Sequence, residues 1–591
     1  MKLLAELNEI SQGLKSTLSF LAQKEKINLF VATILMFLAG ALVNLPAVIL
    51  GKFVDQIIDL KKPNFSLALP FLGAIITIVL LKETLTIIRK YLVENIATQT
   101  EKKLTVQVVG HLLKTDLGEF INKYQIGALH GRIFRSIQGL VKLIKLGFLD
   151  FFPTFFAALA ALIIAFYQKP ALASFMILVI PVGLFIVIKQ ISSQKGIRVS
   201  LLRGKEKIDG RVVEMMGGLE TIRVANTADL EIKKIETIAE GLRKIEIKHH
   251  IYMMFYDAAK YLNETFFYIL VISLAIYFAL NGLITKGDIL TYSILFMSIV
   301  TPLATIHRIL DEAHESALRV QDLNDLINQP LDQSFKVEAG DKTTETDTIL
   351  EIKNLSFTYP GKTETVLKNI NLKIKNGEKI GIAGASGCGK STLIKIILRL
   401  VHNYSGSINF LGKNLDLLSR ETIAEKIAYI PQKTYVFSGT VKENVLYGLR
   451  KNFEDKKIIE ALKEANIYDE VINNLGGLDG VVTENGNNLS GGQKQRLALA
   501  RLILLSPEVL IFDEATSALD NTNEMIIQNN LEKLFAGKTI ITIAHRLTTL
   551  KNSDRILVFA AGEIVQVGNF KQLSENDGLF KDFLTHAKKI I

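Results

Sequence analysis

Cysteine is nearly absent from this chain of 591 residues, which contains a single one, Cys388. One cysteine cannot form an intrachain disulfide and cannot supply a metal site built from several thiolates. Because Cys388 lies inside the glycine-rich stretch Gly384–Ser391, no cysteine is left for the nucleophile of a cysteine protease. These three classes of protein are therefore excluded.

Apolar sequence, in contrast, is abundant, since 49% of the residues are hydrophobic. Six long runs contain no charged residue, and each is close to the ~20 residues that a helix needs to cross a bilayer. Six such runs in one chain favour membrane spans over buried helices of a soluble core. The runs are Ile27–Gly51, Pro63–Leu81, Phe151–Gln168, Pro170–Ile188, Thr265–Thr285 and Ile289–Ile306.

The first 26 residues lack the features of a cleavable signal peptide, because acidic residues come early and no uninterrupted apolar core precedes Lys15. Apolar residues recur at helical spacing from Leu3 to Leu21, with charges between them. This pattern predicts an amphipathic helix on the membrane surface, with an ordinary soluble helix as the alternative.

The net charge of +10 comes from 69 basic and 59 acidic residues. Much of the excess lies beside apolar runs, which fits a membrane surface better than nucleic acid as a partner. The long links Lys82–Lys145 and Lys189–Glu264 are rich in Lys and Arg, which predicts that they face the cytoplasm. Helical periodicity continues through both links, so we expect helices that extend beyond the bilayer, with tips at Phe120–Ile126 and Ala225–Leu230.

The stretch Gly384–Ser391 reads Gly-Ala-Ser-Gly-Cys-Gly-Lys-Ser and fits the phosphate-binding P-loop pattern. Its glycines allow backbone amides to face an anion, Lys390 would reach the β- and γ-phosphates, and Ser391 would bind Mg²⁺. A strand is predicted at Lys379–Ala383 and a helix at Thr392–Leu398. The residues expected to bind ATP here are Gly384, Ser386, Gly387, Gly389, Lys390, Ser391 and Thr392.

A second apolar strand, Val509–Asp513, is followed directly by Glu514, so that two carboxylates lie at its end. Beside a P-loop, Asp513 would hold Mg²⁺. Glu514 would act as the general base that polarises the attacking water. Strands that end in acidic residues are common. The roles of Asp513 and Glu514 are therefore inferred from their position after the P-loop.

The stretch Leu489–Arg496 reads Leu-Ser-Gly-Gly-Gln-Lys-Gln-Arg and opens a predicted helix. A serine and two glycine amides at a helix N-terminus form another anion site, although a simple helix cap is the plain alternative. Here the chain resembles the ATP-binding cassette (ABC) family, whose signature is Leu-Ser-Gly-Gly-Gln. The residues that would contact ATP from this motif are Ser490, Gly491, Gly492 and Gln493.

The resemblance implies roles for four further residues. Gln432 is similar to the family's glutamine that touches Mg²⁺, and His545 to the catalytic histidine that contacts the γ-phosphate. Asp520, in Ser-Ala-Leu-Asp, is similar to an aspartate of the dimer interface, and Tyr359 to the aromatic residue that stacks on adenine. The expected cofactors are ATP and Mg²⁺. The implied Mg²⁺ ligands are Ser391, Gln432 and Asp513.

The resemblance covers the whole chain and implies a half-transporter of the type I ABC exporter class. The fold expected is an α-helical six-span membrane domain followed by an α/β P-loop ATPase domain, the ABC cassette. The boundaries expected are an amphipathic interfacial helix at 1–26, the membrane domain at 27–329, a polar linker at 330–348 and the cassette at 349–591.

One P-loop and one signature per chain imply a dimer, because in this family the signature of one subunit closes over ATP bound to the other. The partner is a second copy or a paralogous half-transporter. Coupling turns are implied at Phe120–Ile126 and Ala225–Lys233. The loop Thr483–Gly486 lies where exporters carry a cross-linking loop, but Asn485, Asn487 and Asn488 depart from its usual pattern.

The cargo is left open among peptide, lipid and hydrophobic drug, and membrane lipid is an expected partner. An aromatic and methionine-rich cluster, from Tyr252 to Tyr277, would suit an amphipathic cargo or simply pack against lipid. A non-exporting ABC ATPase that acts on nucleic acid, and an importer, are the alternatives, and the six spans fused to the cassette argue against both. We expect a multi-pass protein of a bacterial cell membrane, with the N-terminus and the cassette in the cytoplasm.

Overall fold

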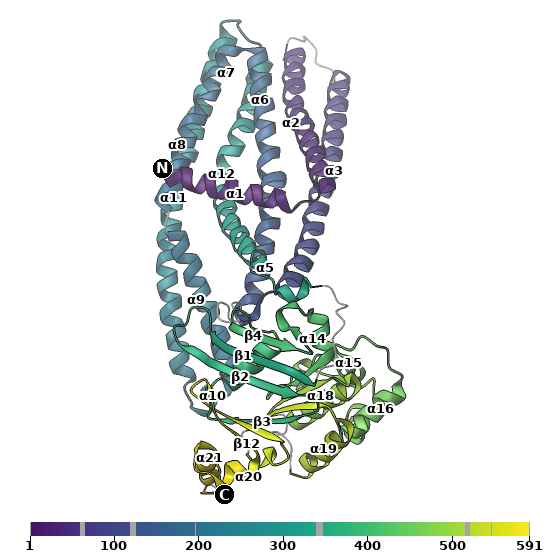
Figure 1. Ribbon diagram of the computed structural model, residues 1–591. Helices are drawn as coiled ribbons and strands as arrows, with labels where there is room; N and C mark the ends of the chain where they lie inside the picture. Colours follow the sequence, from purple (N-terminus) through teal and green to yellow (C-terminus); the bar gives the residue numbers. More distant parts are fainter. Residues whose placement is uncertain are drawn as a thin grey trace. The chain divides into compact units, whose positions relative to one another are not determined.

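The structure is a computed structural model that describes residues 2–58, 65–118, 126–194, 197–337, 347–514, 521–544 and 547–589. The chain divides into two compact units. The first comprises Met1–Leu113 and Gln125–Asn328, and the second comprises Lys114–Tyr124 and Gln329–Ile591. The described residues of the first unit form helices and turns, whereas the second unit combines helices with sheets (Figure 1).

Six helical stretches of the described chain are long and apolar enough to cross a membrane, and each overlaps one of the six predicted runs. The prediction of a six-span membrane domain is therefore confirmed. The stretches are Gln23–Gln56, Phe65–Leu112, Leu129–Gln168, Pro170–Ser193, Ala228–Leu280 and Lys286–Ile327.

Several of these helices are much longer than a bilayer requires, as the links had predicted. α11 has 53 residues and α12 has 42, against the ~20 needed to span the hydrocarbon. The helices of this unit are α1 Lys2–Phe20, α2 Gln23–Ile58, α3 Leu69–Leu112, α5 Ile126–Lys145, α6 Phe152–Gln168, α7 Pro170–Ile177, α8 Val179–Gln194, α9 Ile197–Gly217, α10 Leu219–Val224, α11 Ala228–Leu280 and α12 Lys286–Ile327.

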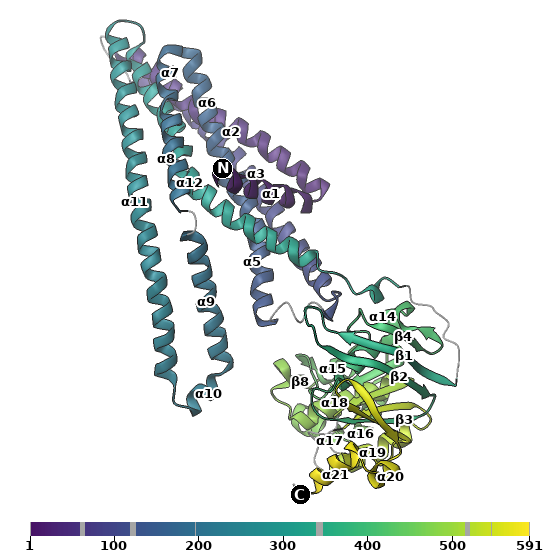
Figure 2. The ribbon, with the colours of Figure 1, turned by 60° about the vertical axis from the view of Figure 1, so that its left-hand side comes forward.

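The tip predicted at Ala225–Leu230 is a turn of only three residues, because α11 already begins at Ala228. α9 and α11 lie side by side, and the short α10 joins them at this end (Figure 2). Of the other predicted tip, Phe120–Ile126, only Ile126 is described, as the first residue of α5. Phe120–Gln125 lies outside the described residues.

The predicted amphipathic helix forms α1, which crosses the long helices of its unit (Figure 1). It packs closely on α12, since a Cβ added to Gly13 would lie 2.8 Å from the Cβ of Ala317. Glu9 also pairs with His314 of α12, with 2.8 Å between Oε2 and Nε2. α2 begins at Gln23, so the last four residues of the expected 1–26 segment belong to the first span.

The second unit contains two main sheets. The antiparallel sheet has the order β2-β1-β4-β5, and the larger sheet has the order β12-β11-β3-β10-β9-β6. The strands are β1 Thr348–Thr358, β2 Thr365–Lys375, β3 Lys379–Gly384, β4 Ser405–Phe410, β5 Lys413–Asn414, β6 Ile427–Ile430, β9 Val509–Asp513, β10 Thr539–Ile543, β11 Arg555–Ala560 and β12 Glu563–Gly568. A further pair consists of β7 Gly439–Thr440 and β8 Val481–Val482.

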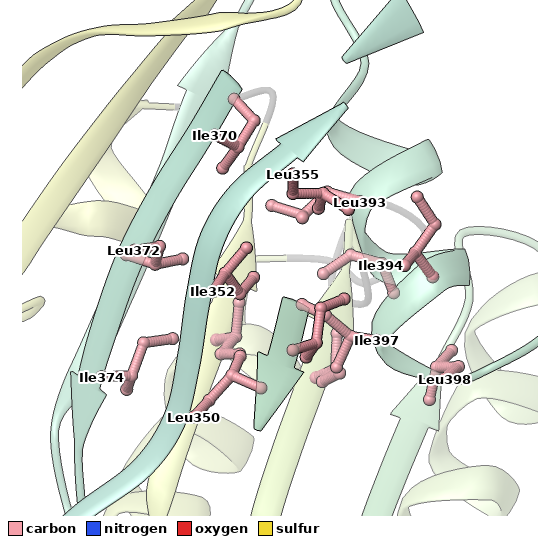
Figure 3. Close-up of a cluster of buried hydrophobic side chains, with 14 of the residues drawn as sticks. Leu350, Ile352, Leu355, Ile370, Leu372, Ile374, Leu393, Ile394, Ile397 and Leu398 are labelled. Atoms are coloured by element: carbon pink, nitrogen blue, oxygen red, sulfur yellow. The ribbon is translucent and has the colours of Figure 1, made fainter. Parts of the chain in front are cut away.

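The helices of the second unit include α13 Lys390–Ile397, α14 Arg420–Lys426, α15 Val441–Leu446, α16 Asp455–Glu464, α17 Tyr468–Glu470, α18 Gly491–Leu505, α19 Asn521–Leu534, α20 Phe570–Glu575 and α21 Leu579–Lys589. One apolar core joins α13 to both main sheets. Leu393, Ile394 and Ile397 of α13 face the apolar side chains of β1 and β2 (Figure 3). This core holds the N-terminus of α13 at the end of β3.

The strands β11, β3, β10, β9 and β6 are parallel to one another, so their carboxyl ends share one edge of the sheet, whereas β12 pairs with β11 in the antiparallel sense. In register, Ile543 at the end of β10 lies beside Asp513 at the end of β9. Ligands of open α/β sheets bind at this edge. The P-loop and the two predicted carboxylates therefore reach the same edge from different parts of the chain.

Part of the expected linker 330–348 is ordered against the second unit. Leu331 pairs with Thr115 in an isolated antiparallel bridge. Asp332 is nearly buried and lies 3.2 Å from His402. Burial opposes its ionisation, but the neighbouring His402 and the hydrogen bond from the backbone N–H of Ser334 outweigh burial and lower the pKa of Asp332 to about 2.

Candidate active site

The predicted P-loop connects β3 to α13. The helix begins at Lys390, two residues before the predicted start, so its backbone N–H groups begin directly after the loop. The Lys390 ammonium donates hydrogen bonds to the carbonyl oxygens of Gly384 (2.7 Å) and Ala385 (2.8 Å). The Lys390 ammonium and the N-terminus of α13 together give the loop the positive potential that favours binding of a phosphate chain.

The glycines of this loop have backbone conformations that side chains disfavour. Gly384 has φ +153°, and a Cβ there would overlap the carbonyl oxygen of Phe559 and lie 2.8 Å from the sulfur of Cys388. Gly387 has φ +81°, but an added Cβ would meet nothing within 4 Å. The first glycine is thus required by close packing, and the second by backbone conformation alone.

Tyr359 lies beside the P-loop helix, as its predicted contact with adenine requires. Its hydroxyl is 3.2 Å from the hydroxyl of Thr392, and its ring contacts Phe357 edge-on at 4.9 Å between centroids. Ser386 and Ser391 are exposed, whereas Thr392 is buried. The structure therefore places Tyr359, Ser386, Ser391 and Thr392 around one loop, with the two serines open to solvent.

The two carboxylates follow β9 and have different surroundings. Asp513 is buried and accepts a hydrogen bond from the Tyr429 hydroxyl at 3.2 Å. Burial raises the pKa of Asp513, and the charge of Glu514 adds to this effect. Glu514 is partly exposed, and its Oε2 accepts a hydrogen bond of 2.6 Å from Nε2 of Gln432. Gln432 and Glu514, which are 82 residues apart in the sequence, therefore lie in direct contact.

The sequence did not indicate that Glu514 has a left-handed backbone, with φ +53°. Residues other than glycine rarely adopt this conformation, and such strain gathers at functional sites. A hydrogen bond of 3.0 Å from its backbone N–H to the carbonyl of Ile543 holds it in place. The hydrogen bond to the end of β10 thus fixes the backbone of Glu514 and with it the direction of the carboxylate. No local sequence pattern reveals this constraint.

Three oxygen donors form the candidate Mg²⁺ site: the Asp513 carboxylate, the Gln432 amide and the Ser391 hydroxyl. Hard oxygen ligands suit Mg²⁺. Tyr429 binds only Oδ2 of Asp513, and Gln432 uses its nitrogen on Glu514, which leaves its amide oxygen for a metal. The chemistry of the donors therefore fits Mg²⁺.

The signature residues form the N-terminus of α18. Ser490 is its N-cap, and its hydroxyl accepts a hydrogen bond from the backbone N–H of Gln493 at 3.2 Å. The Gln493 side chain in turn accepts one from the backbone N–H of Ser490 at 2.8 Å. Ser490 and Gly491 are exposed, as a site that closes over another subunit requires. α18 belongs to a different apolar core from α13.

The three asparagines that depart from the exporter pattern include two with local structural roles. Asn485 has φ +55°, a conformation that asparagine tolerates well. The Asn488 side chain accepts hydrogen bonds from the backbone and hydroxyl of Thr483, both at 3.0 Å. The loop from Thr483 to Asn488 is therefore stabilised by hydrogen bonds to its own side chains. Two other predicted site residues, His545 and Asp520, lie outside the described residues.

Two family models match the chain. One, described as ABC transporter transmembrane region, matches residues 29–303, and the other, described as ABC transporter, matches residues 367–517. This chain belongs to the ABC transporter family. It is a multi-pass membrane protein that fuses an exporter-type membrane region to one ATP-binding domain and couples ATP hydrolysis to transport.

Proteins of similar sequence or structure agree with the assignment to the ABC transporter family. The transporter is 28% identical to an ATP-dependent lipid A-core flippase of Desulfotalea psychrophila over 94% of this chain and 96% of the relative. It is 34% identical to a leukotoxin translocation ATP-binding protein of a Pasteurella haemolytica-like species, over 52% of this chain and 43% of the relative. The structure of a bacterial Atm1-family ABC exporter with ATP bound has the same fold, with TM-score 0.82, 22% identity and coverage of 96% and 99% of the two chains.

The position of Cys388 gives a first test of the P-loop. Its sulfur lies 3.7 Å from the Lys390 ammonium and is nearly buried. We expect alkylation with N-ethylmaleimide to abolish most ATPase activity, because the added group would displace the lysine, and we expect prior ATP to protect. Cys388→Ala should remain active and resist the reagent. Full activity of stoichiometrically alkylated wild-type protein would contradict this assignment.

Proposed function

We propose that this transporter exports an amphipathic cargo with an acidic group, a lipid or a peptide, as a homodimer with two working ATP sites. The membrane is a bacterial cell membrane, with the cassette and N-terminus on the cytoplasmic side. The basic residues of the long links support this orientation. The relatives named for a lipid and for a protein toxin support these cargo classes.

A charged cluster within the membrane unit carries the proposal about the cargo. Arg89 of α3 is only 6% exposed, and its Nε has no hydrogen-bond partner among the described residues. Burying a charge without full pairing is costly, so a guanidinium in this position is a candidate contact for a ligand. An acidic group of the cargo would satisfy this Nε, beside the Asp150 carboxylate whose charge already favours the guanidinium.

Neighbouring charges extend the cluster across three helices. Arg308 of α12 lies 3.8 Å from Asp150 and 3.0 Å from Glu312. Lys142 of α5 pairs with Glu312 at 2.9 Å. Asp150 belongs to the π-helical segment Leu146–Phe151, which interrupts the third span, and such segments are frequent at functional sites. The cluster holds three cations, Arg89, Arg308 and Lys142, against two carboxylates, Asp150 and Glu312, which leaves one positive charge for an acidic group of the cargo.

The homodimer is supported by the completeness of the ATP site in this one chain. P-loop, base and signature residues all match the family pattern, so two copies supply two full sites. ATP held by the P-loop of one copy would be closed over by Ser490 and the amides of Gly491 and Gly492 of the other. Closure would draw the cassettes together and turn the cargo cavity outward.

Hydrolysis would then reset the transporter. Glu514 would accept a proton from the attacking water, and its strained backbone and the Gln432 amide would hold the carboxylate in place. Lys390 would stabilise charge on the phosphates. Mg²⁺, when bound by Asp513, Ser391 and Gln432, would neutralise charge that develops on the transferring phosphoryl group.

The test is ATPase activity of the purified chain alone in lipid nanodiscs, with acidic lipids, peptides and hydrophobic drugs titrated in turn. We expect basal turnover and stimulation by an acidic lipid or peptide. Stimulation by neutral drugs alone would contradict the cargo class. ATP binding without turnover would contradict the homodimer and indicate a heterodimer with a paralogous half-transporter.

Substitution of Arg89 tests the proposed contact with the acidic group of the cargo. We expect Arg89→Ala to remove cargo stimulation while basal ATPase activity changes less than ~2-fold, because Arg89 belongs to the first unit and the described ATP-site residues belong to the second. Arg89→Lys should keep part of the stimulation, since it keeps the charge but not the forked geometry. Lys90→Ala, at an exposed neighbour on α3, is the control and should behave as wild type. Undiminished stimulation of Arg89→Ala would place the cargo elsewhere.

A further inference from the structure

Glu470 connects the signature motif to the body of its domain. It ends the short helix α17, and its carboxylate has two partners. Oε2 accepts a hydrogen bond of 2.7 Å from Nε2 of Gln493, and Oε1 forms an ion pair with Nη1 of Arg496 at 2.7 Å. Both partners belong to α18, at its first turn and one turn further on. One carboxylate therefore binds the beginning of the helix that presents Ser490.

The bond to Gln493 determines which way its side-chain amide is turned. Because the amide nitrogen of Gln493 donates to Glu470, the amide oxygen faces the backbone N–H of Ser490. This oxygen accepts a hydrogen bond of 2.8 Å from that N–H. Ser490 in turn accepts from the backbone of Gln493 with its hydroxyl. The capping box that orients the Ser490 hydroxyl thus depends on an acceptor outside the motif.

Arg496 anchors Glu470 and balances its charge. Its side chain is only 7% exposed, and Nη1 also donates to the carbonyl of Asn466 at 2.6 Å. Without this cation, a carboxylate beside a phosphate-binding helix end would repel the ligand. With it, Glu470 serves as an acceptor for Gln493 at little electrostatic cost to phosphate binding.

The surroundings leave room for Gln493 to move if Glu470 is lost. A cavity of about 110 Å³ is lined by Glu470, Leu489, Asn488 and Gln493 among others. The amide could rotate into this space, so close packing does not hold it in place. We propose that Glu470 is a positioning residue that fixes Gln493, and through it the Ser490 hydroxyl, for ATP bound to the other subunit. This inference rests on the proposed composite site of a homodimer.

The first experiment compares Glu470→Ala with Asp469→Ala, which removes a carboxylate from the adjacent, exposed position. We expect Glu470→Ala to lower kcat/KM for ATP by ~10-fold, the effect of losing one charge-assisted hydrogen bond. ATP binding to the P-loop, measured with a fluorescent ATP analogue, should change less than ~2-fold. Asp469→Ala should match wild type in both assays. If Glu470→Ala fails to bind nucleotide, Glu470→Met, which fills a similar space but offers no oxygen acceptor, replaces it in every assay.

The second experiment uses mixed dimers purified through two different tags. With Lys390→Ala on one chain and Glu470→Ala on the other, one composite site keeps both an intact P-loop and an intact signature. With both changes on one chain and a wild-type partner, neither site is intact. We expect the first arrangement to be ~10-fold more active than the second.

The outcomes distinguish the positioning role of Glu470 from the composite ATP site of the dimer. Higher activity of the second arrangement would show that Glu470 serves its own P-loop and would overturn the composite site. Equal activities of the two arrangements, with Glu470→Ala dimers as active as wild type, would overturn the role of Glu470 and leave the composite site intact.

Discussion

Glu514→Gln is expected to lower ATP turnover by ~10²-fold or more while ATP binding persists. Glutamine keeps the size of the side chain and can still accept the 2.6 Å hydrogen bond from Gln432. It cannot accept a proton from water at neutral pH, so only the general-base function is removed. Turnover is measured by phosphate release in nanodiscs, and binding by equilibrium retention of radiolabelled ATP.

A matched control lies at the other end of the same strand. Glu508 precedes β9 and pairs with Lys538 at 3.0 Å, away from the carboxyl edge of the sheet. Glu508→Gln makes the same chemical change, and we expect it to alter turnover less than ~2-fold because surface ion pairs contribute little. If Glu514→Gln kept wild-type turnover, another group would have to be the base.

Much of the architecture could be predicted from the sequence because the evidence is local. Apolar runs locate the six spans, although several helices extend far beyond them, and short apolar segments determine strands within a residue, as at β3 and β9. The P-loop and signature are also local, since their spacing alone places glycines, Lys390 and Ser490. The contact between Gln432 and Glu514, in contrast, was not predicted, because 82 residues separate them.

What could not be predicted depends on contacts between distant segments. The left-handed backbone of Glu514 is held by Ile543 of another strand, and no residue pattern marks it. Glu470 lies in an ordinary helical turn, and only the fold brings it to Gln493. Arg89 follows an apolar run like any flanking cation, and its burial depends on neighbouring helices. Contacts that charged residues make with segments distant in the sequence are thus what the sequence could not reveal.

Gly384→Ala is expected to lower ATP affinity by ~100-fold or more and to lower the thermal stability of the second unit. At φ +153° the backbone is in a region that is nearly exclusive to glycine. The new Cβ would also overlap the carbonyl of Phe559 on the neighbouring strand β11, so the loop or the strand must move. Strain of ~3 kcal/mol corresponds to about the stated loss of affinity.

Gly387→Ala separates backbone strain from steric overlap. Its φ of +81° also disfavours alanine, but an added Cβ would meet nothing within 4 Å. The cost should be ~1–2 kcal/mol, which corresponds to roughly a 10-fold loss of affinity. Both variants are compared in full-length protein by ATP titration and by thermal unfolding. If the two substitutions had equal effects in both measurements, the contact between Gly384 and Phe559 would not shape the loop, and its glycines would be required only for their flexibility.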